Sequence, residues 1–389
     1  MKTSKMIFLL SYLCMASVTS TIISPALPTI AQNFQVDIQA INWVNSIFLF
    51  GYMAGQLVYG PLANRYGRLF ALRVGIVTML MGILLTLQAA YTLHYGLFIF
   101  GRFITALGAA SGLACTFMLL VELLPATQSA KAMAYGPLFF TLVIGGSAFI
   151  GGWVSQHYNW QATCYLLLIY GVIMLAGTLI FKEPMKKSVK LNIKTLIDGY
   201  KNALKSRQLL IFSFCVGLVS LFAYGYSTVA PIFAIQQLKL SSFEYGQWNL
   251  INMLGMGGSS MIGAYLIAKI GHQRLLKLAL LALIPGLMAL YWLQSCQSPS
   301  VVAFFLTTTW LYLFSGLIFP AGSYFATQAI EDKASASSMM SCINIGTAFI
   351  GLTLLGHIPM NMLAGLLLML IAALSLCLIS TTLFFKQLS

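Results

Sequence analysis

Residues 60–68 read Gly-Pro-Leu-Ala-Asn-Arg-Tyr-Gly-Arg and lie between two hydrophobic segments, near 41–62 and 70–90. Gly60 and Gly67 allow a tight reversal and a close approach of the flanking segments. Arg65 and Arg68 place two positive charges in this short gap, where they can be held at lipid headgroups. The stretch therefore predicts a helical hairpin in a membrane, with its turn on the side that retains positive charge.

The same sign of charge recurs in every second gap between hydrophobic segments. The chain has 21 Lys and Arg, 7 Asp and Glu, a net charge of +14 and 59% hydrophobic residues. Of the basic residues, only Lys239 lies in an intervening gap and only Arg102 lies inside an apolar segment. A soluble nucleic-acid-binding protein would instead gather its charge on one surface, so we expect no nucleic-acid partner. Because Lys and Arg are retained in the cytoplasm during insertion, both termini are expected there, with an even number of spans.

Twelve segments approach the roughly 20 apolar residues that cross a bilayer. The first resembles a signal peptide, but Pro25 and Pro28 disrupt a cleavage site and removal would leave an odd number of spans, so no cleavage is expected. We predict an all-α membrane protein with twelve transmembrane helices in two pseudo-symmetric six-helix bundles. The segments lie near 6–30, 41–62, 70–90, 95–121, 132–154, 161–181, 208–235, 243–267, 275–294, 300–328, 335–356 and 361–385.

A basic polar stretch divides the chain into bundles at 1–181 and 208–389, joined by a linker at 182–207. Within the linker, apolar residues recur at helical spacing from Leu191 to Leu204 with lysines between them. This pattern favours an amphipathic helix on the inner membrane surface, where anionic lipids attract basic residues. A regulatory docking segment is the alternative.

An internal repeat supports two related halves. Leu62–Gly67 follows the second predicted span and Leu266–Gly271 follows the eighth, and both read Leu-x-x-basic-x-Gly. Repeated halves of this kind are typical of transporters, which bind substrate between the halves near the middle of the membrane.

The gap at 60–68 resembles the Gly-x-x-x-Asp-Arg-x-Gly-Arg loop of the major facilitator superfamily. The residues 21–34 (TIISPALPTIAQNF), Arg102 with Gly108, and 151–161 (GGWVSQHYNWQ) are most similar to its drug-exporting branch, which includes bicyclomycin- and chloramphenicol-resistance proteins. This resemblance covers the whole chain. It implies a secondary transporter without a cofactor, which exports a drug-like molecule or small metabolite.

The resemblance also implies a gate at the loop that joins the second and third spans. Asn64 stands where the family has an acidic residue that holds the halves together, so the charge is missing here. Glu122, at the inner end of the fourth span, is the nearest replacement, and we predict that it pairs with Arg65 or Arg68 rather than lying free in solvent. The predicted gate comprises Gly60, Asn64, Arg65, Gly67, Arg68 and Glu122.

Arg102 lies about a third of the way into the fourth predicted span. Burying it costs about 2.5–3.5 kcal/mol, so such a residue usually faces a cavity, whereas its alternative is to extend to the outer headgroups. The first span carries hydroxyls at 17–21, where related cation exporters carry a carboxylate, and no acid lies in the middle of a span. A neutral or anionic substrate is therefore favoured over a cation.

Other polar and aromatic residues in the spans are candidates for lining the substrate cavity, although each aromatic could equally face lipid or pack. Amides are the better candidates because they avoid lipid. The predicted set is Asn45, Tyr135, Phe222, Tyr226, Asn252, Trp310 and Asn344.

Several other functions are disfavoured. The four histidines, at 94, 157, 272 and 357, lie unpaired at span ends, which disfavours a membrane enzyme, and no ATP-binding loop occurs. We expect a monomer in a bacterial inner membrane, contacting lipids, a small-molecule substrate and in some mechanisms protons. Export over uptake or facilitation rests on the resemblance alone.

Overall fold

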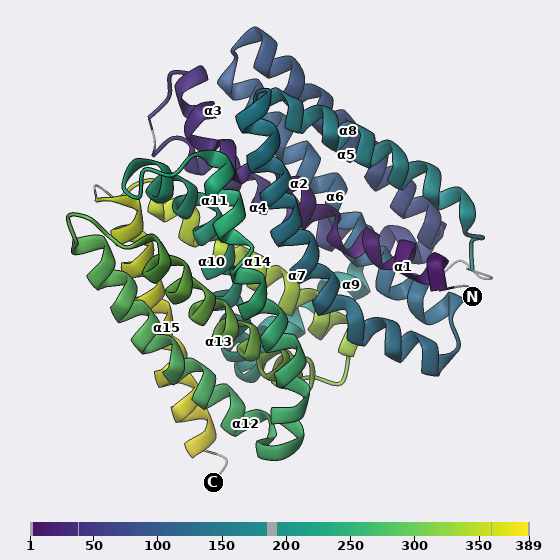
Figure 1. Cartoon of the computed structure of the whole chain (residues 1–389). Coiled ribbons are helices and arrows are strands. Elements are labelled where there is room, and N and C mark those ends of the chain that lie inside the picture. Colours follow the sequence, from purple (N-terminus) through teal and green to yellow (C-terminus); the bar gives the residue numbers. More distant parts are fainter. Residues whose placement is uncertain (1–2, 38, 185–192, 359, 388–389) are drawn as a thin grey trace. The chain divides into compact units, whose positions relative to one another are not determined.

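The computed structural model describes residues 3–37, 39–184, 193–358 and 360–387, and all regular structure in these ranges is helical (Figure 1). The chain divides into two compact units, Met1–Leu191 and Asn192–Ser389. The division falls inside the predicted linker. Each unit is described by itself.

The first unit begins with an interrupted helix, α1 to α3, in which Pro25 and Pro28 each lack the N–H that a continuous helix needs. Four long helices and a shorter final one follow it. The bounds are α1 Thr3–Ser11, η1 Tyr12–Cys14, α2 Met15–Thr21, η2 Ser24–Ala26, α3 Leu27–Asn33, α4 Asn42–Tyr66, α5 Arg68–Thr92, α6 Tyr95–Leu123, α7 Ala126–His157, α8 Gln161–Gly177 and η3 Thr178–Ile180.

The second unit begins with a short helix and continues through longer ones. Its bounds are α9 Ile193–Lys205, α10 Arg207–Gln236, α11 Ser242–Asn249, α12 Asn252–Ser295, α13 Val301–Thr327, α14 Lys333–Leu355 and α15 Met362–Lys386. The helical run at 242–295 supplies two spans, because Gly271 breaks α12 with a φ of +76°. Ser241 and Glu244 cap the start of α11 reciprocally.

Ten helical segments of the described ranges are long and apolar enough to cross a membrane. One of them, Ser242–Ser295, is 54 residues long and contains the break at Gly271, so it accounts for two predicted spans. The second predicted span is α4, which has 25 residues but is less apolar because it carries Asn42, Asn45 and Gln56. The predicted all-α fold with twelve spans is thus confirmed.

The two units repeat one packing pattern. In the first, α2 packs on α7, α4 and α5 pack on α6, and α5 packs on α8. In the second, α10 packs on α14, α12 on α13, and α12 on α15, which are the equivalent spans. Gly67 and Gly271 of the predicted repeat are also the two glycines with positive φ in the described ranges. Both adopt a backbone that L-residues avoid, so each repeat ends in the same kind of turn.

Glycines on α4 and α6 allow close helix packing. A Cβ at Gly55 would collide with Leu107 and Ala110 of α6, and a Cβ at Gly108 would collide with Met79 of α5. Gly146 differs, since nothing lies within 4 Å of the Cβ it would carry. The first unit is therefore packed tightly around α6, the helix that carries Arg102.

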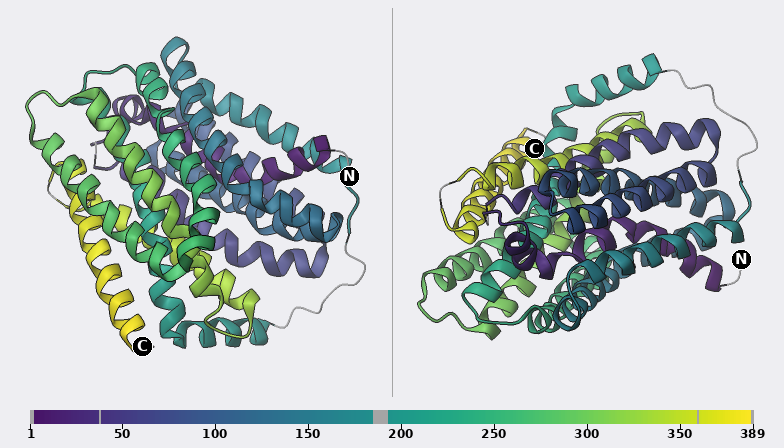
Figure 2. Two further views of the ribbon diagram at one scale, coloured as in Figure 1. Left: turned by 60° about the horizontal axis from the view of Figure 1, so that its bottom comes forward. Right: turned by 90° about the horizontal axis from the view of Figure 1, so that it is seen from above.

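The predicted amphipathic helix of the linker forms as α9, while residues 185–192 lie outside the described residues. It meets α10 at a steep angle after Ser206, whose backbone is extended (Figure 2). Its apolar face does not serve lipid alone, because Tyr200 and Ala203 pack against α14 of the same unit. The expected position of this helix on the inner membrane surface stays a prediction.

Candidate functional site

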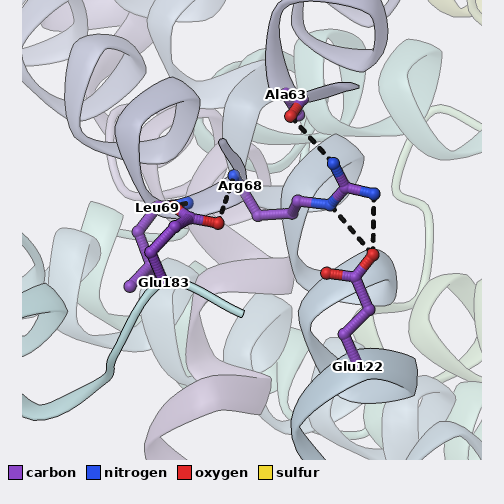
Figure 3. A network of polar contacts seen from close by, with 5 residues as sticks. All are labelled: Ala63, Arg68, Leu69, Glu122 and Glu183. Carbon is purple, nitrogen blue, oxygen red and sulfur yellow. Dashed lines mark hydrogen bonds and ion pairs between the residues drawn. The ribbon is translucent and has the colours of Figure 1, made fainter. Parts of the chain in front are cut away.

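The turn between α4 and α5 is held by Arg68 (Figure 3). Its Nε and Nη2 donate to Oε1 of Glu122 at 3.0 and 2.7 Å, and its Nη1 donates to the Ala63 carbonyl at 3.0 Å. The guanidinium thus ties the start of α5 to the ends of α4 and α6. Of the two partners predicted for Glu122, the structure selects Arg68.

Glu183, which the sequence reading left without a role, completes this turn from the end of the sixth span. Its two carboxylate oxygens accept the backbone N–H groups of Arg68 at 2.9 Å and Leu69 at 2.8 Å (Figure 3). The first N–H groups of a helix lack internal partners and attract negative charge, so Glu183 stabilises the start of α5. A Cβ at Gly67 would lie 2.7 Å from Glu183 Oε2, so the glycine is required by space as well as by its φ of +115°.

The remaining predicted gate residues lie outside this network. Gly60 is inside α4, with nothing within 4 Å of the Cβ it would carry, so it does not form the reversal expected of it. Asn64 and Arg65 are exposed on the last turn of α4, and the Arg65 guanidinium lies 5.2 Å from the Tyr66 ring centroid. The structure therefore brings together Gly67, Arg68 and Glu122 of the predicted six.

Arg102 is buried inside the first unit, with 1% of its surface exposed. Its Nη1 donates to the Thr19 carbonyl of α2 at 2.8 Å, and its guanidinium carbon lies 4.5 Å from the Phe48 ring centroid of α4. The side chain therefore points into the helix packing and does not extend to the headgroups. Its Nε and Nη2 have no hydrogen-bond partner among the described residues.

The surroundings of Arg102 contain hydroxyls and no carboxylate. Thr19 lies in the 17–21 stretch, and its own hydroxyl donates to backbone carbonyls of its helix. All seven acids of the chain are exposed, so none is buried beside the guanidinium. The guanidinium thus keeps two N–H-bearing nitrogens without a partner among the described residues, in an interior where its charge is weakly screened.

Two other predicted residues belong to the first unit. Asn45 is buried on α4, one turn before Phe48, and thus lies on the same helix face as the ring beneath Arg102. The side chain of Tyr135 lies outside the described residues.

A second buried polar group lies where the eighth span is interrupted. Between α11 and α12 the backbone bonds are of the i→i−3 type, with Leu250 N–H donating to Gln247 and Leu254 N–H to Ile251. Such a 3₁₀ stretch inside a helix often marks a hinge. The break places Asn249 and Asn252 on the same side, facing α10 and α13.

These amides form one hydrogen-bonded network with Tyr226 of α10 and two threonines of α13. The Asn252 amide nitrogen donates to the Tyr226 hydroxyl and to Asn249 Oδ1, each at 2.8 Å, and the Tyr226 hydroxyl donates to Asn249 Oδ1 at 3.0 Å. Thr308 and Thr309 donate to Asn252 Oδ1 at 2.9 and 3.0 Å. We call these five residues the span-eight network. Tyr226 and Asn252 were predicted, whereas Asn249, Thr308 and Thr309 were missed.

The other predicted residues of the second unit lie around or away from this network. Phe222 is buried and packs on Tyr226 and Tyr312, with ring centroids 6.1 and 4.9 Å apart. Trp310 is 43% exposed and donates its indole N–H to the Ala282 carbonyl at 2.7 Å, so it stabilises helix packing at the surface. Asn344 is buried in α14, and its amide oxygen has no partner among the described residues.

Comparison with known proteins identifies the family to which this fold belongs. Residues 9–352 match the family model of the Major Facilitator Superfamily. The chain is 23% identical over 261 residues to a bicyclomycin resistance protein homolog of Haemophilus influenzae, a match that covers 66% of this chain and 64% of that protein. It is also 31% identical over 165 residues to the 4-hydroxybenzoate transporter PcaK of Pseudomonas putida, covering 42% of this chain and 35% of that one.

Solved structures with the same fold are transporters. The inward-open xylose transporter XylE of E. coli superimposes with a TM-score of 0.76 at 13% identity, covering 98% of this chain and 95% of that one. The nucleoside transporter NupG gives 0.75 at 14% identity, covering 99% and 98%. At such identities the likeness concerns the fold. The family match over most of the sequence shows that the chain belongs to the Major Facilitator Superfamily and is an integral membrane transporter, not an enzyme.

Proposed function

We propose that this transporter exports a small neutral or anionic molecule, or an amphipathic one with an acidic group, across a bacterial inner membrane. The observation that carries the proposal is Arg102, a buried cation with two unpartnered nitrogens and no buried acid beside it. In a low-dielectric interior its positive potential is weakly screened. A carboxylate entering near Arg102 would gain a charge-assisted hydrogen bond, whereas a cation would be repelled.

Relatives support export and also supply the alternative. A bicyclomycin resistance protein homolog and an efflux pump of Hypomyces subiculosus favour an exporter. The 4-hydroxybenzoate transporter is named for an aromatic carboxylate, which agrees with an anionic substrate. Uptake or facilitated passage of a neutral or anionic metabolite is therefore the second candidate.

Alternating access would use the Arg68 turn and the span-eight network in different ways. The Arg68 turn lies at the ends of membrane-spanning helices and is suited to a gate, because it joins α4, α5 and α6 through polar contacts that can be remade. The span-eight network lies at a helix interruption, where transporters commonly form binding sites. With no acid in the middle of any span, a driving proton gradient would have to act through another group.

Flux measurements test this proposal directly. In proteoliposomes with and without a pH gradient, we expect transport of an aromatic carboxylate such as 4-hydroxybenzoate and no transport of ethidium. Starting with substrate on either side separates export from uptake. Transport of ethidium without transport of any carboxylate or neutral compound would contradict the proposal.

The orientation with both termini in the cytoplasm makes a separate prediction. Single cysteines introduced at 37 or 239 should react with an impermeant reagent in intact cells, because these positions lie in gaps without a basic cluster. Cysteines at 131, 190 or 333 should react only after permeabilisation. Reaction of a cysteine at 190 in intact cells would invert the whole topology.

The proposed gate predicts the effect of restoring the acidic residue of the family loop. Because Asn64 lies in the last turn of α4, a charge there can be stabilised only by the N-terminus of another helix across the proposed gate. Asn64→Asp should strengthen that inner contact by about 1 kcal/mol and shift the population toward the outward-open state. Spin labels in the loops between spans two and three and between spans ten and eleven report this as a shorter distance. Asn64→Gln, which adds no charge, is the control and should leave the distance unchanged. An unchanged distance in Asn64→Asp would refute the gate.

A further inference from the structure

Helix α9 carries two distinct faces. Gly199, Tyr200 and Ala203 lie on one side, and Ala203 is fully buried in a cluster with Leu209, Ala336 and Met339. Burial raises the pKa of Tyr200, and the nearby Ser338 side chain of α14 lowers it to a smaller extent. This side of α9 is thus fixed to the first turns of α14.

The contact between α9 and α14 is close enough to exclude any side chain at Gly199. A Cβ there would lie 2.6 Å from the Ser335 hydroxyl oxygen. Ser335 cannot easily turn away, because its hydroxyl donates to Asp332 at 2.6 Å and its N–H to the same carboxylate at 3.2 Å. A displacement of α9 would therefore be transmitted to the capped start of α14.

The flank of α9 beside this face is about half exposed among the described residues. Ile197 and Leu204 are 45% and 48% exposed and lie seven residues apart, which places them on one edge of the helix. Lys201 and Lys205 are exposed next to them, and Arg207 follows at the start of α10. Apolar residues bordered by lysines match the boundary between acyl chains and anionic headgroups, into which lysine stems extend.

We infer that the edge formed by Ile197, Lys201, Leu204 and Lys205 docks on anionic phospholipid, and that α9 transmits this contact to α14. The membrane surface is then a regulatory ligand of the transporter. Because α14 is the eleventh span, the amount of anionic lipid sets the position of the inner end of this span. The inference holds whichever substrate is carried.

Docking is tested with a fluorophore on single cysteines at 197, 204 and, as control, 202, in a background without native cysteines. Asn202 is exposed on the polar side of the same helix. In vesicles of phosphatidylcholine and phosphatidylglycerol that carry a lipid-borne quencher, labels at 197 and 204 should be blue-shifted and quenched, and the label at 202 should not. Equal quenching at all three positions would overturn the inference, because the helix would then not dock by one edge. Absence of quenching at all three would overturn it as well, because this edge would then not contact lipid.

The charge dependence is tested with Lys201→Gln/Lys205→Gln. Each lysine contributes about 1 kcal/mol near an anionic surface, so docking should weaken roughly 30-fold. Quenching should then require more phosphatidylglycerol. It should also decline at high salt in the parent protein. Quenching that is the same in pure phosphatidylcholine would contradict a role for anionic lipid.

The coupling to α14 is tested by a distance between spin labels at Tyr66 and Ser337. We expect the distance to change when phosphatidylglycerol is added to the parent protein. Gly199→Val should push α9 from Ser335 and abolish this change while quenching at 197 persists, and Tyr200→Phe, which adds no bulk, should reduce it. An unchanged distance in the parent, or the full response in both variants, would overturn the coupling.

Discussion

Replacing Arg102 with alanine is expected to abolish transport of a carboxylate while leaving expression and membrane insertion nearly intact. Among the described residues, the guanidinium has one hydrogen bond, to the Thr19 carbonyl, and two unpartnered nitrogens, so its removal sacrifices few hydrogen bonds. It also relieves the insertion cost of about 2.5–3.5 kcal/mol for an arginine inside a span. Carboxylate flux in proteoliposomes, with protein yield in the membrane fraction, measures both effects.

Arg102→Lys provides the matched control. A lysine keeps the charge and a cation–π contact with Phe48, but a point charge does not reproduce the planar guanidinium, so only partial transport should return. Failure of Arg102→Ala to insert would identify a structural arginine. Proton-coupled export of ethidium-like cations by the unmodified protein would contradict the charge argument altogether.

Replacing Asn252 with leucine should be the most damaging change in the second unit. The variant loses four hydrogen bonds, to Tyr226, Asn249, Thr308 and Thr309. At about 0.6 kcal/mol for each bond in a membrane protein, unfolding should become easier by about 2 kcal/mol. Thermal unfolding in detergent measures the loss, and flux should fall with it if the network binds substrate.

Asn344→Leu is the control for this experiment. Asn344 is also buried, but its amide oxygen has no partner among the described residues, so leucine should leave the unfolding temperature unchanged or raise it. If Asn344→Leu destabilises the protein as strongly as Asn252→Leu, the effect comes from loss of a buried amide in general. The hydrogen bonds of the span-eight network would then not explain the loss of stability.

The overall fold could be predicted because its determinants are local in the sequence. Basic residues in alternate gaps set the number of spans, and the Leu-x-x-basic-x-Gly repeat marked the turns at Gly67 and Gly271. The break between α11 and α12 escaped prediction, because Leu250 and Ile251 are ordinary apolar residues in an apolar span. The packing of α9 on α14 escaped too, since the apolar positions of α9 look the same in the sequence whether protein or lipid covers them.

The candidate site was less accessible, because its contacts join distant residues and often involve the backbone. The pairing of Glu122 with Arg68 followed from charge, since few acids are available. Glu183 had no such signal, as it binds backbone N–H groups 115 and 114 residues earlier in the chain. Asn249 could have been suggested because it precedes Asn252 by three residues, about one helical turn. Only the fold places Thr308, which belongs to another helix, against Asn252.

Arg102 is held by a partner that side-chain mutagenesis cannot delete. The acceptor at Thr19 is a peptide carbonyl, and every residue type supplies the same oxygen at that position. A mutational scan of position 19 would therefore leave this contact intact wherever the helix keeps its course. The residue type at position 19 could therefore vary between related proteins without a compensating change at position 102. Methods that detect correlated substitutions would then find no trace of this hydrogen bond between the first and fourth spans.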